Sequence, residues 1–320
     1  MESRNIDELE FIDDALTPRR TKKSALPSPD GFKTYFSSQD GNFELYHDDC
    51  LELMPLFPAE SFDMIFADPP YFLSNGGITC HAGKMVSVNK GKWDKSKGFQ
   101  GNYEFTKKWL SECQRLMKPN ATIWISGTNH IIHIVGFALE ELGFKILNDI
   151  TWVKTNPPPN LSCRYFTHAT ETILWAGRDS KTRHTFNYKL MKALNSGKQM
   201  TSVWRLDAPS REEKIFGKHP TQKPLALLER IIAASTNEKE LVLDPFTGSS
   251  TTGIASSRLK RQFVGLELEK EYLELSRKRY KLEFIEYGFS RLLNIKIKDN
   301  EIVKSSKNLS FEAFEEVAKI

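Results

Sequence analysis

Residues 61–71, SFDMIFADPPY, indicate the fold most directly. The apolar run MIFA is typical of a buried strand, and the two prolines after it cannot continue the hydrogen bonding of a strand. The strand is therefore expected to end near Asp68. Ligands of open α/β folds bind beyond the carboxyl ends of the strands, so Asp68 is expected at a binding edge.

Alternating strand and helix patterns extend outward from this stretch. NFELYHDDC predicts a short strand and LELMPLF a helical turn before it, while EFTKKWLSECQRLM predicts a helix and ATIWIS a strand after it. Such alternation predicts an α/β fold with a mostly parallel sheet covered by helices. Residues 74–100 are rich in Gly, Lys and Ser, which predicts a long mobile loop.

The tetrapeptide Asp68-Pro69-Pro70-Tyr71 supplies hydrogen-bond acceptors without backbone donors at the prolines. An exocyclic NH₂ group needs two acceptors, and Tyr71 offers a face on which a planar base can stack. The alternative is a plain strand terminator followed by a surface tyrosine.

A second strand end lies in LVLDPFTGSSTTG, residues 241–253. Small residues let the backbone approach a ligand, and the following helix offers free N–H groups to a carboxylate, which suits a nucleoside-amino-acid cofactor. Glu267 ends the next strand, where Rossmann folds bind a ribose diol; an exposed strand-end glutamate is the alternative. The loop matches neither G-x-x-x-x-G-K-S/T nor G-x-G-x-x-G, which argues against NTP hydrolysis and hydride transfer.

The composition excludes several classes. Of 320 residues, 39% are hydrophobic and 27% charged, and no apolar run approaches the ~18 residues of a membrane helix. The acidic start argues against a secretory signal. The four cysteines, at positions 50, 80, 113 and 163, form no C-x-x-C pair, so we expect a cytoplasmic protein without a metal site. None of them follows a proline, which argues against a cysteine nucleophile for carbon-5 methylation of cytosine.

Positive charge is concentrated in residues 151–224, where 13 Lys and Arg face 5 Asp and Glu. That block carries +8 and the remainder of the chain −4. Such a surface suits a polyphosphate such as a nucleic acid, although a solvated basic face is the alternative.

The motifs together resemble the β-class amino-group DNA methyltransferases, which use S-adenosyl-L-methionine (AdoMet). The resemblance rests on D-P-P-Y, on H-P-T-Q-K-P at residues 219–224 and on D-P-F-T-G-S at 244–249, in an order that is circularly permuted. The stretches FADPPYFLSNGGI, TNPPPNLSCRYFTH and ETILWA look most similar to the GATC-specific adenine methyltransferases of Dpn-type restriction-modification systems, including the form that accepts single-stranded DNA. Ser250 departs from the glycine usual in the family.

This resemblance implies a Rossmann-like sheet with a C-terminal antiparallel strand and an inserted target-recognition region. We accordingly divide the chain into a partly disordered extension (1–40), the catalytic half of the core (41–154), the recognition insertion with a core strand near 170–177 (155–218), the AdoMet-binding half (219–286) and a C-terminal extension (287–320). In the last part we expect a strand or loop and then a helix, FEAFEEVAKI.

The resemblance also implies residue roles. Asp68 and the Pro69 carbonyl would accept hydrogen bonds from the target amino group, with Pro70 completing the turn and Tyr71 stacking on the flipped base. Phe246 would pack on the cofactor adenine, and Glu267 would bind the ribose. The implied cofactor site comprises Asp49, Asp68, Thr221, Lys223, Asp244, Phe246, Gly248, Ser249, Ser250, Thr251, Thr252 and Glu267. Without the family, H-P-T-Q-K-P reads as a helix-entry turn.

For DNA contact we select Lys84, Lys92, Lys95, Arg164, Tyr165, Arg183 and Lys198. Aromatic residues interleaved with the basic block, Tyr165, Phe166, Phe186, Tyr188 and Trp204, could hold an unpaired strand by stacking. For Phe166 and Phe186 we prefer burial in the core of the insertion.

The expected activity is transfer of a methyl group from AdoMet to the N6 amino group of adenine in duplex DNA, without a covalent enzyme intermediate. Acceptors that hold both amino hydrogens favour a pyramidal nitrogen, whose lone pair can attack in line. GATC specificity, single-stranded DNA, a cognate restriction endonuclease and a homodimer are further expectations. The alternatives are an N4-cytosine methyltransferase and a non-catalytic nucleic-acid-binding protein of the same fold.

Overall fold

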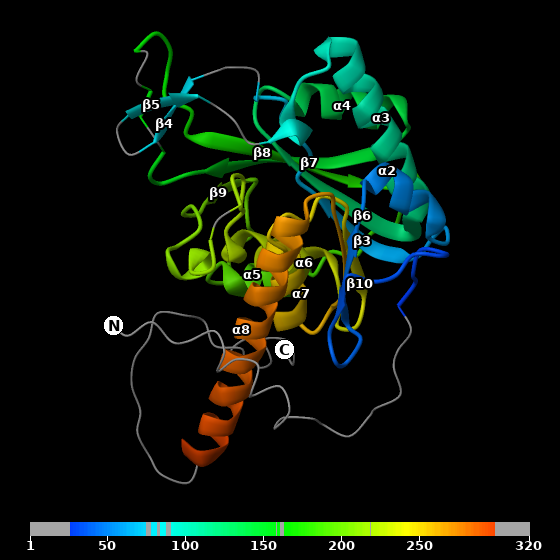
Figure 1. The fold of residues 1–320 in the computed structure, drawn as a ribbon, viewed down its shortest axis with the longest axis vertical. Coiled ribbons are helices and arrows are strands. Elements are labelled where there is room, and N and C mark those ends of the chain that lie inside the picture. The colour runs from blue at the N-terminus through cyan, green and yellow to red at the C-terminus, as the bar shows by residue number, and fades with distance from the viewer. Residues whose placement is uncertain are drawn as a thin grey trace.

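The computed structural model describes residues 26–74, 78–81, 84–87, 91–157, 159–160, 163–217 and 219–297. Its main sheet runs in the order β1-β2-β11-β10-β3-β6-β8-β7-β9, with helices on both faces (Figure 1). The strands of this sheet are β1 (Phe36–Ser37), β2 (Phe43–His47), β3 (Phe62–Ala67), β6 (Met117–Gly127), β7 (Lys145–Val153), β8 (Thr170–Gly177), β9 (Val203–Arg205), β10 (Leu241–Asp244) and β11 (Gln262–Glu267).

Helices alternate with these strands along most of the chain, as the sequence predicts. They are α2 (Cys50–Leu53), α3 (Gly98–Leu116), α4 (Ile132–Glu141), α5 (Tyr188–Leu194), α6 (Leu225–Ser235), α7 (Thr251–Arg258) and α8 (Lys270–Ile297), with short 3₁₀ turns η1 (Met54–Leu56), η2 (Lys92–Asp94) and η3 (Glu212–Lys214). Strand β3 is buried at five of its six residues, as expected for a strand covered on both faces.

The pairing places the two motif-bearing strands side by side. Val242 and Leu243 of β10 pair in parallel with Met64 and Ile65 of β3. Asp68 and Asp244 therefore follow neighbouring strands at one edge of the sheet, although they lie far apart in the chain. This edge is the carboxyl end at which α/β folds bind ligands.

The sheet is mostly parallel, as predicted, but its antiparallel pairing differs from the expectation. Strand β8 runs antiparallel to both β6 and β7, and β1 runs antiparallel to β2. The last strand, β11, is parallel to both of its neighbours. The expected C-terminal antiparallel strand is therefore not present at this position.

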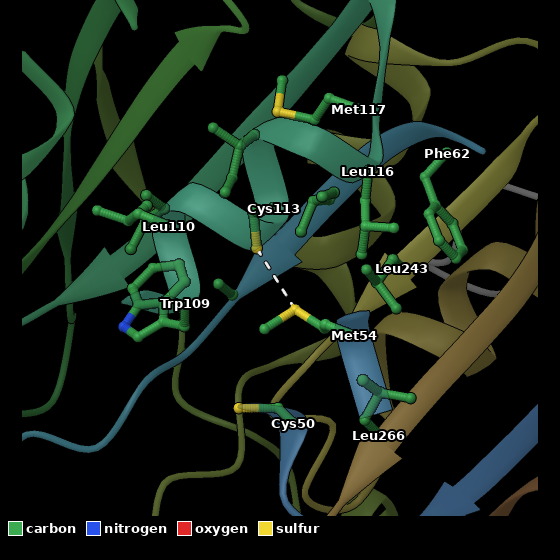
Figure 2. Packing of buried hydrophobic residues seen from close by; sticks show 14 of the residues in the cluster. Cys50, Met54, Phe62, Trp109, Leu110, Cys113, Leu116, Met117, Leu243 and Leu266 are labelled. Carbon is green, nitrogen blue, oxygen red and sulfur yellow. Dashed lines mark hydrogen bonds between the residues drawn. The ribbon is translucent and has the colours of Figure 1, made fainter. Parts of the chain in front are cut away.

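A hydrophobic core fills the space between the sheet and helices α2, α3 and α4. Cys113 of α3 lies against Met54, with a sulfur-to-sulfur distance of 4.0 Å, and Trp109 and Leu116 pack on either side of it (Figure 2). Burial raises the pKa of both Cys113 and Cys50 above the ordinary thiol value. These two thiols are therefore protonated packing groups.

Two expectations about the connecting segments need correction. Residues 74–100 are not all loop, since β4 (Ile78–His81) and β5 (Lys84–Ser87) pair as an antiparallel hairpin and α3 begins at Gly98. Helix α8 continues through 287–297, where we expected a strand or loop. In the N-terminal segment, Leu26 is buried and β1 belongs to the sheet. The predicted helix FEAFEEVAKI lies outside the described residues.

In the described part of the chain, no helix has the length and apolar character needed to cross a membrane.

Candidate active site

The carboxylate of Asp68 lies just beyond β3 and is the centre of a hydrogen-bonded cluster. Its Oδ1 accepts hydrogen bonds from the Tyr71 hydroxyl at 2.7 Å and the Ser126 hydroxyl at 2.5 Å. Its Oδ2 accepts one from the Lys223 ammonium at 2.6 Å. Ser126 lies near the end of β6, the neighbour of β3, so three separate parts of the chain meet at this carboxylate.

Lys223 comes from the H-P-T-Q-K-P turn before α6 and is buried beside the tetrapeptide. Its ammonium also lies 3.1 Å from the Tyr71 hydroxyl and 3.7 Å from Oε2 of Glu171. Glu171, on β8, forms an ion pair at 2.5 Å with Lys154, which follows β7. The turn, which the family resemblance places near the cofactor, therefore also contacts the tetrapeptide Asp68–Tyr71.

The charges of this cluster stabilise one another. Burial alone would raise the pKa of Asp68, but the Lys223 ammonium and the Ser126 and Tyr71 hydroxyls lower it below its ordinary value. Burial would lower the pKa of Lys223, but Asp68 and Glu171 raise it. Burial and these same two carboxylates raise the pKa of Tyr71. Asp68 is therefore an ionised acceptor near neutral pH, and Tyr71 is a neutral phenol.

Asp94 of η2 fixes the backbone after the tetrapeptide. Its buried carboxylate accepts hydrogen bonds from the Tyr71 N–H at 2.9 Å, the Leu73 N–H at 3.1 Å and the Ser74 hydroxyl at 2.8 Å. A side chain 23 residues away thus sets the position of Tyr71. Nothing in the local sequence distinguishes Asp94 from a surface aspartate, and the prediction missed it.

The loop after β10 is held by its own side chains. Asp244 accepts hydrogen bonds from the Phe246 N–H at 3.0 Å and the Thr252 hydroxyl at 2.6 Å. Ser250 has a left-handed backbone, with φ at 53°, and its hydroxyl lies 3.0 Å from the Thr247 hydroxyl. A left-handed position favours glycine, which explains why glycine is usual there in the family that the sequence resembles.

Helix α8 supports the same loop from behind, which the sequence did not predict. Arg279 donates hydrogen bonds to the Ser249 carbonyl at 2.5 Å and to the Thr251 hydroxyl at 3.0 Å. The Ser276 hydroxyl donates to the Gly248 carbonyl at 2.8 Å. Burial lowers the pKa of Arg279 to about 10, so this guanidinium is still charged near neutral pH.

Glu267 ends β11, and Asp49 lies two residues beyond the end of β2, the adjacent parallel strand. Glu267 accepts hydrogen bonds from the Gly248 N–H at 2.8 Å and from the Glu269 N–H at 2.9 Å. Asp49 caps α2 by accepting a hydrogen bond from the Leu51 N–H at 2.9 Å. The structure therefore brings Glu267 to the Asp244 loop and places Asp49 one strand further along the same edge.

Two cavities adjoin the Asp68 cluster. The first is a narrow space of about 20 Å³ between the tetrapeptide and the loop, lined by Asp68, Lys223, Asp244, Phe246, Gly248 and His219 among others. The second, of about 410 Å³, is lined by Tyr71, Thr128, Trp152, Lys154 and Glu171 among others. Thr128 Oγ1 and Gln222 Oε1, which belong to lining residues of the second cavity, are buried and have no hydrogen-bond partner among the described residues.

The residues selected for DNA contact differ from this buried cluster in their exposure to solvent. Arg164, Tyr165, Arg183, Lys198 and Lys95 are exposed. The side chains of Lys84 and Lys92 lie outside the described residues.

The expectation for two of the aromatic residues was wrong. Phe166 is 96% exposed on the segment between β7 and β8, and Phe186 is 44% exposed, with its ring against Trp175. Tyr188 is also exposed, whereas Trp204 is buried. Phe166 therefore does not contribute to a core of the insertion.

Comparisons with known proteins show the family to which this chain belongs. Residues 62–278 match the model of the N6/N4 methyltransferase family, which is described as DNA methylase. The chain belongs to this family. It is 58% identical over 240 residues to the Type II methyltransferase M2.DpnII of Streptococcus pneumoniae, a match that covers 75% of this chain and 90% of the relative. It is 55% identical over 248 residues to M2.LlaDCHI of Lactococcus lactis subsp. cremoris, covering 77% and 91%.

Solved structures extend the comparison. The crystal structure of the M1.HpyAVI–SAM complex is 32% identical, with a TM-score of 0.55, and the match covers 73% of this chain and 97% of that one. The PvuII DNA methyltransferase, described as cytosine-N4-specific, is 19% identical with a TM-score of 0.61. The match covers 90% of this chain and 95% of that one and shows that the two share the fold. The chain is thus an AdoMet-dependent DNA methyltransferase of the amino-group family.

The chemistry of the loop fits AdoMet, which carries two positive charges. Burial, together with the Asp68 and Glu267 carboxylates, raises the pKa of Asp244 to about 7. Burial likewise raises the pKa of Glu267 to about 7. A site with such an excess of carboxylates is stabilised by a cationic ligand. Among the described residues, no group of three or more His, Cys, Asp or Glu side chains is arranged to hold a metal ion.

Proposed function

We propose that this protein methylates the N6 amino group of adenine in DNA, with the Asp68–Tyr71 tetrapeptide as the catalytic element. The observation that carries the proposal is the ionised Asp68 carboxylate, held by Ser126 and Tyr71 beside a cavity of about 410 Å³. A flipped base in that cavity would present its amino group to Asp68 and to the Pro69 carbonyl. The two acceptors would take both amino hydrogens and leave the nitrogen lone pair free for in-line attack.

The residues around the loop would hold the methyl donor, which supplies an electrophilic methyl group when bound. Phe246 would pack against the cofactor adenine. Its ring is half-buried against Trp109, with the two ring centroids 5.4 Å apart. Glu267 would accept hydrogen bonds from the ribose, and Asp49 would take the adenine amino group at the next strand end. Asp244 and the backbone at Gly248, Ser249, Ser250, Thr251 and Thr252 would face the methionine part, with Thr221 and Lys223 near it.

Adenine is favoured over cytosine by two features. The tetrapeptide begins with Asp68, which in the resembling family is typical of adenine-specific members. The cavity is also large enough for a purine, and the unpartnered Thr128 hydroxyl and Gln222 carbonyl oxygen are groups that the edge of a base could satisfy. N4-methylation of cytosine is the second candidate, and the product base distinguishes the two.

GATC in duplex and single-stranded DNA is the proposed substrate. The exposed Tyr165 and Phe166 lie on the segment between Lys154 and Glu171, two residues that line the cavity. Aromatic faces beside exposed arginine can hold an unpaired strand by stacking and phosphate contact. A single strand also has no base pair to open before flipping.

The wider assignments complete the proposal. We propose that the motifs follow the circularly permuted order and that the chain divides into the five parts given above. We also propose a cytoplasmic location, no metal requirement, a function beside a cognate restriction endonuclease, and assembly as a homodimer. None of these depends on the chemistry at Asp68.

Oligonucleotide assays test the specificity. Matched GATC and scrambled sequences, each as single and double strands, are incubated with the protein and radiolabelled AdoMet. We expect label in GATC in both forms. Equal labelling of scrambled DNA would contradict the sequence preference, and labelling of the duplex alone would contradict the acceptance of single strands.

A further inference from the structure

Glu171 is a buried carboxylate on β8 that the proposed methyl transfer does not use directly. Its side chain is 9% exposed, and its two oxygens have unequal partners. Oε1 binds the Lys154 ammonium at 2.5 Å, whereas Oε2 lies 3.4 Å from the Tyr71 hydroxyl and 3.7 Å from the Lys223 ammonium. Oε2 can therefore accept a closer donor than it has in this structure.

Asp68 is in the opposite situation, because both of its oxygens are engaged. Ser126 and Tyr71 hold Oδ1, and the Lys223 ammonium holds Oδ2 at 2.6 Å. A target amino group that binds Oδ2 therefore competes with the Lys223 ammonium for that oxygen. The two hydroxyls come from the strand end and the tetrapeptide itself, whereas Lys223 lies on a long flexible side chain.

An ammonium displaced from Asp68 needs a new partner. Lys223 is only 6% exposed, and a buried charge without a counter-charge is strongly unfavourable. Glu171 is the second carboxylate that Lys223 contacts in the described part of the chain. The Thr221 carbonyl, 3.2 Å from the ammonium, supplies a hydrogen bond but no charge.

We propose that Glu171 is a positioning residue that receives the Lys223 ammonium when the target amino group takes its place on Asp68. The ammonium shifts from Oδ2 of Asp68 to Oε2 of Glu171, while Lys154 keeps the other oxygen of Glu171. Asp68 becomes available to the base, and Lys223 stays paired. No covalent bond changes and no proton is transferred in this step, which rests on the proposed function of Asp68.

Replacement of Glu171 by Gln tests the proposal, because glutamine keeps the shape but not the charge. We expect kcat/KM for target DNA to fall roughly 10- to 100-fold near neutral pH, since the displaced ammonium loses its counter-charge. The AdoMet dissociation constant should stay near the wild-type value, whereas the melting temperature should fall because Lys154 loses its ion pair with Glu171.

The pH profile separates this role from a merely structural one. The charged and titratable groups around Lys223 are Asp68, Tyr71 and Glu171, with Lys154 behind Glu171 and with Asp244 and His219 lining the adjoining narrow cavity. In the Glu171→Gln variant, Lys223 that has lost its proton carries no charge, so it can leave Asp68 without needing another carboxylate. The kcat/KM deficit should therefore shrink as the pH rises from about 7 to about 9.5.

Two further variants act as controls. Glu171→Asp restores the carboxylate and should show a smaller deficit with the same alkaline recovery; it carries the test if Glu171→Gln fails to fold. Glu112→Gln removes a carboxylate that pairs with Arg115 outside the site and should leave kcat/KM unchanged. Wild-type kcat/KM in Glu171→Gln, or a deficit of equal size at every pH in the variants, overturns the proposal. An inactive wild-type protein would instead contradict the proposed function.

Discussion

The Glu267 carboxylate accepts a hydrogen bond from the Gly248 N–H at 2.8 Å, so the end of β11 fixes the loop that follows β10. The residue proposed to bind the ribose therefore also shapes the loop that would face the methionine part. Glu267→Gln keeps the size but leaves one carbonyl oxygen for two backbone donors. We expect it to weaken AdoMet by about 1–3 kcal/mol, measured by calorimetry. Unchanged affinity would place the ribose elsewhere.

Phe246 offers a test of the cofactor adenine that is independent of charge. Phe246→Ala removes a ring that is half-buried against Trp109, and we expect AdoMet binding to weaken by about 1–3 kcal/mol through lost stacking area. The matched control is Phe99→Ala, which removes a ring that is 72% exposed on α3. If both variants bind AdoMet as the wild type does, Phe246 does not contact the cofactor.

The raised pKa of Asp244 predicts a pH effect on stability. Because the folded pKa is about 7, above that of a free carboxyl, the stabilising contribution is complete below about pH 4 and is lost as the pH rises through 7. Asp244→Asn cannot ionise, so its melting temperature should fall less between about pH 5 and about pH 8 than that of the ligand-free wild type. AdoMet should stabilise the wild type more at the higher pH. If the melting temperatures of the wild type, Asp244→Asn and the surface control Glu238→Gln fall by the same amount over this pH range, the assignment is contradicted.

Ser250 combines a strained backbone with a useful hydroxyl. Ser250→Gly relieves a left-handed conformation that costs about 1 kcal/mol but loses a hydrogen bond of similar value, so its unfolding free energy should stay near that of the wild type. Ser250→Ala loses the bond and keeps the strain, and should be less stable by about 1 kcal/mol in urea denaturation. Equal losses in the two variants would show that the strain is negligible.

The strand ends of the site were predictable, because each is an apolar run closed by a proline or a charged residue. Asp68 follows β3, and Asp244 and Glu267 are the last residues of β10 and β11, as expected. Parallel pairing of β10 with β3 and β11 then brings these ends to one edge of the sheet.

The partners of Asp68 were not predictable in the same way. Ser126 lies 58 residues from Asp68 and Lys223 lies 155 residues away, so their contacts depend on the sheet order and not on local patterns. The turn that carries Lys223 has the local composition of a helix entry, which conceals its role. Phe166 misled the interpretation for another reason: an apolar side chain suggests burial, but on this segment it is exposed.

Nucleoside analysis of methylated DNA tests the central claim, that the Asp68 carboxylate directs transfer to the adenine amino group. Oligonucleotides treated with wild type and with Asp68→Asn are digested and their nucleosides identified by mass. We expect N6-methyl-2′-deoxyadenosine as the product of the wild type, and a rate lower by about 10²–10³-fold for Asp68→Asn with AdoMet affinity retained. N4-methyl-2′-deoxycytidine as the product, or near-normal turnover by Asp68→Asn, would contradict the account.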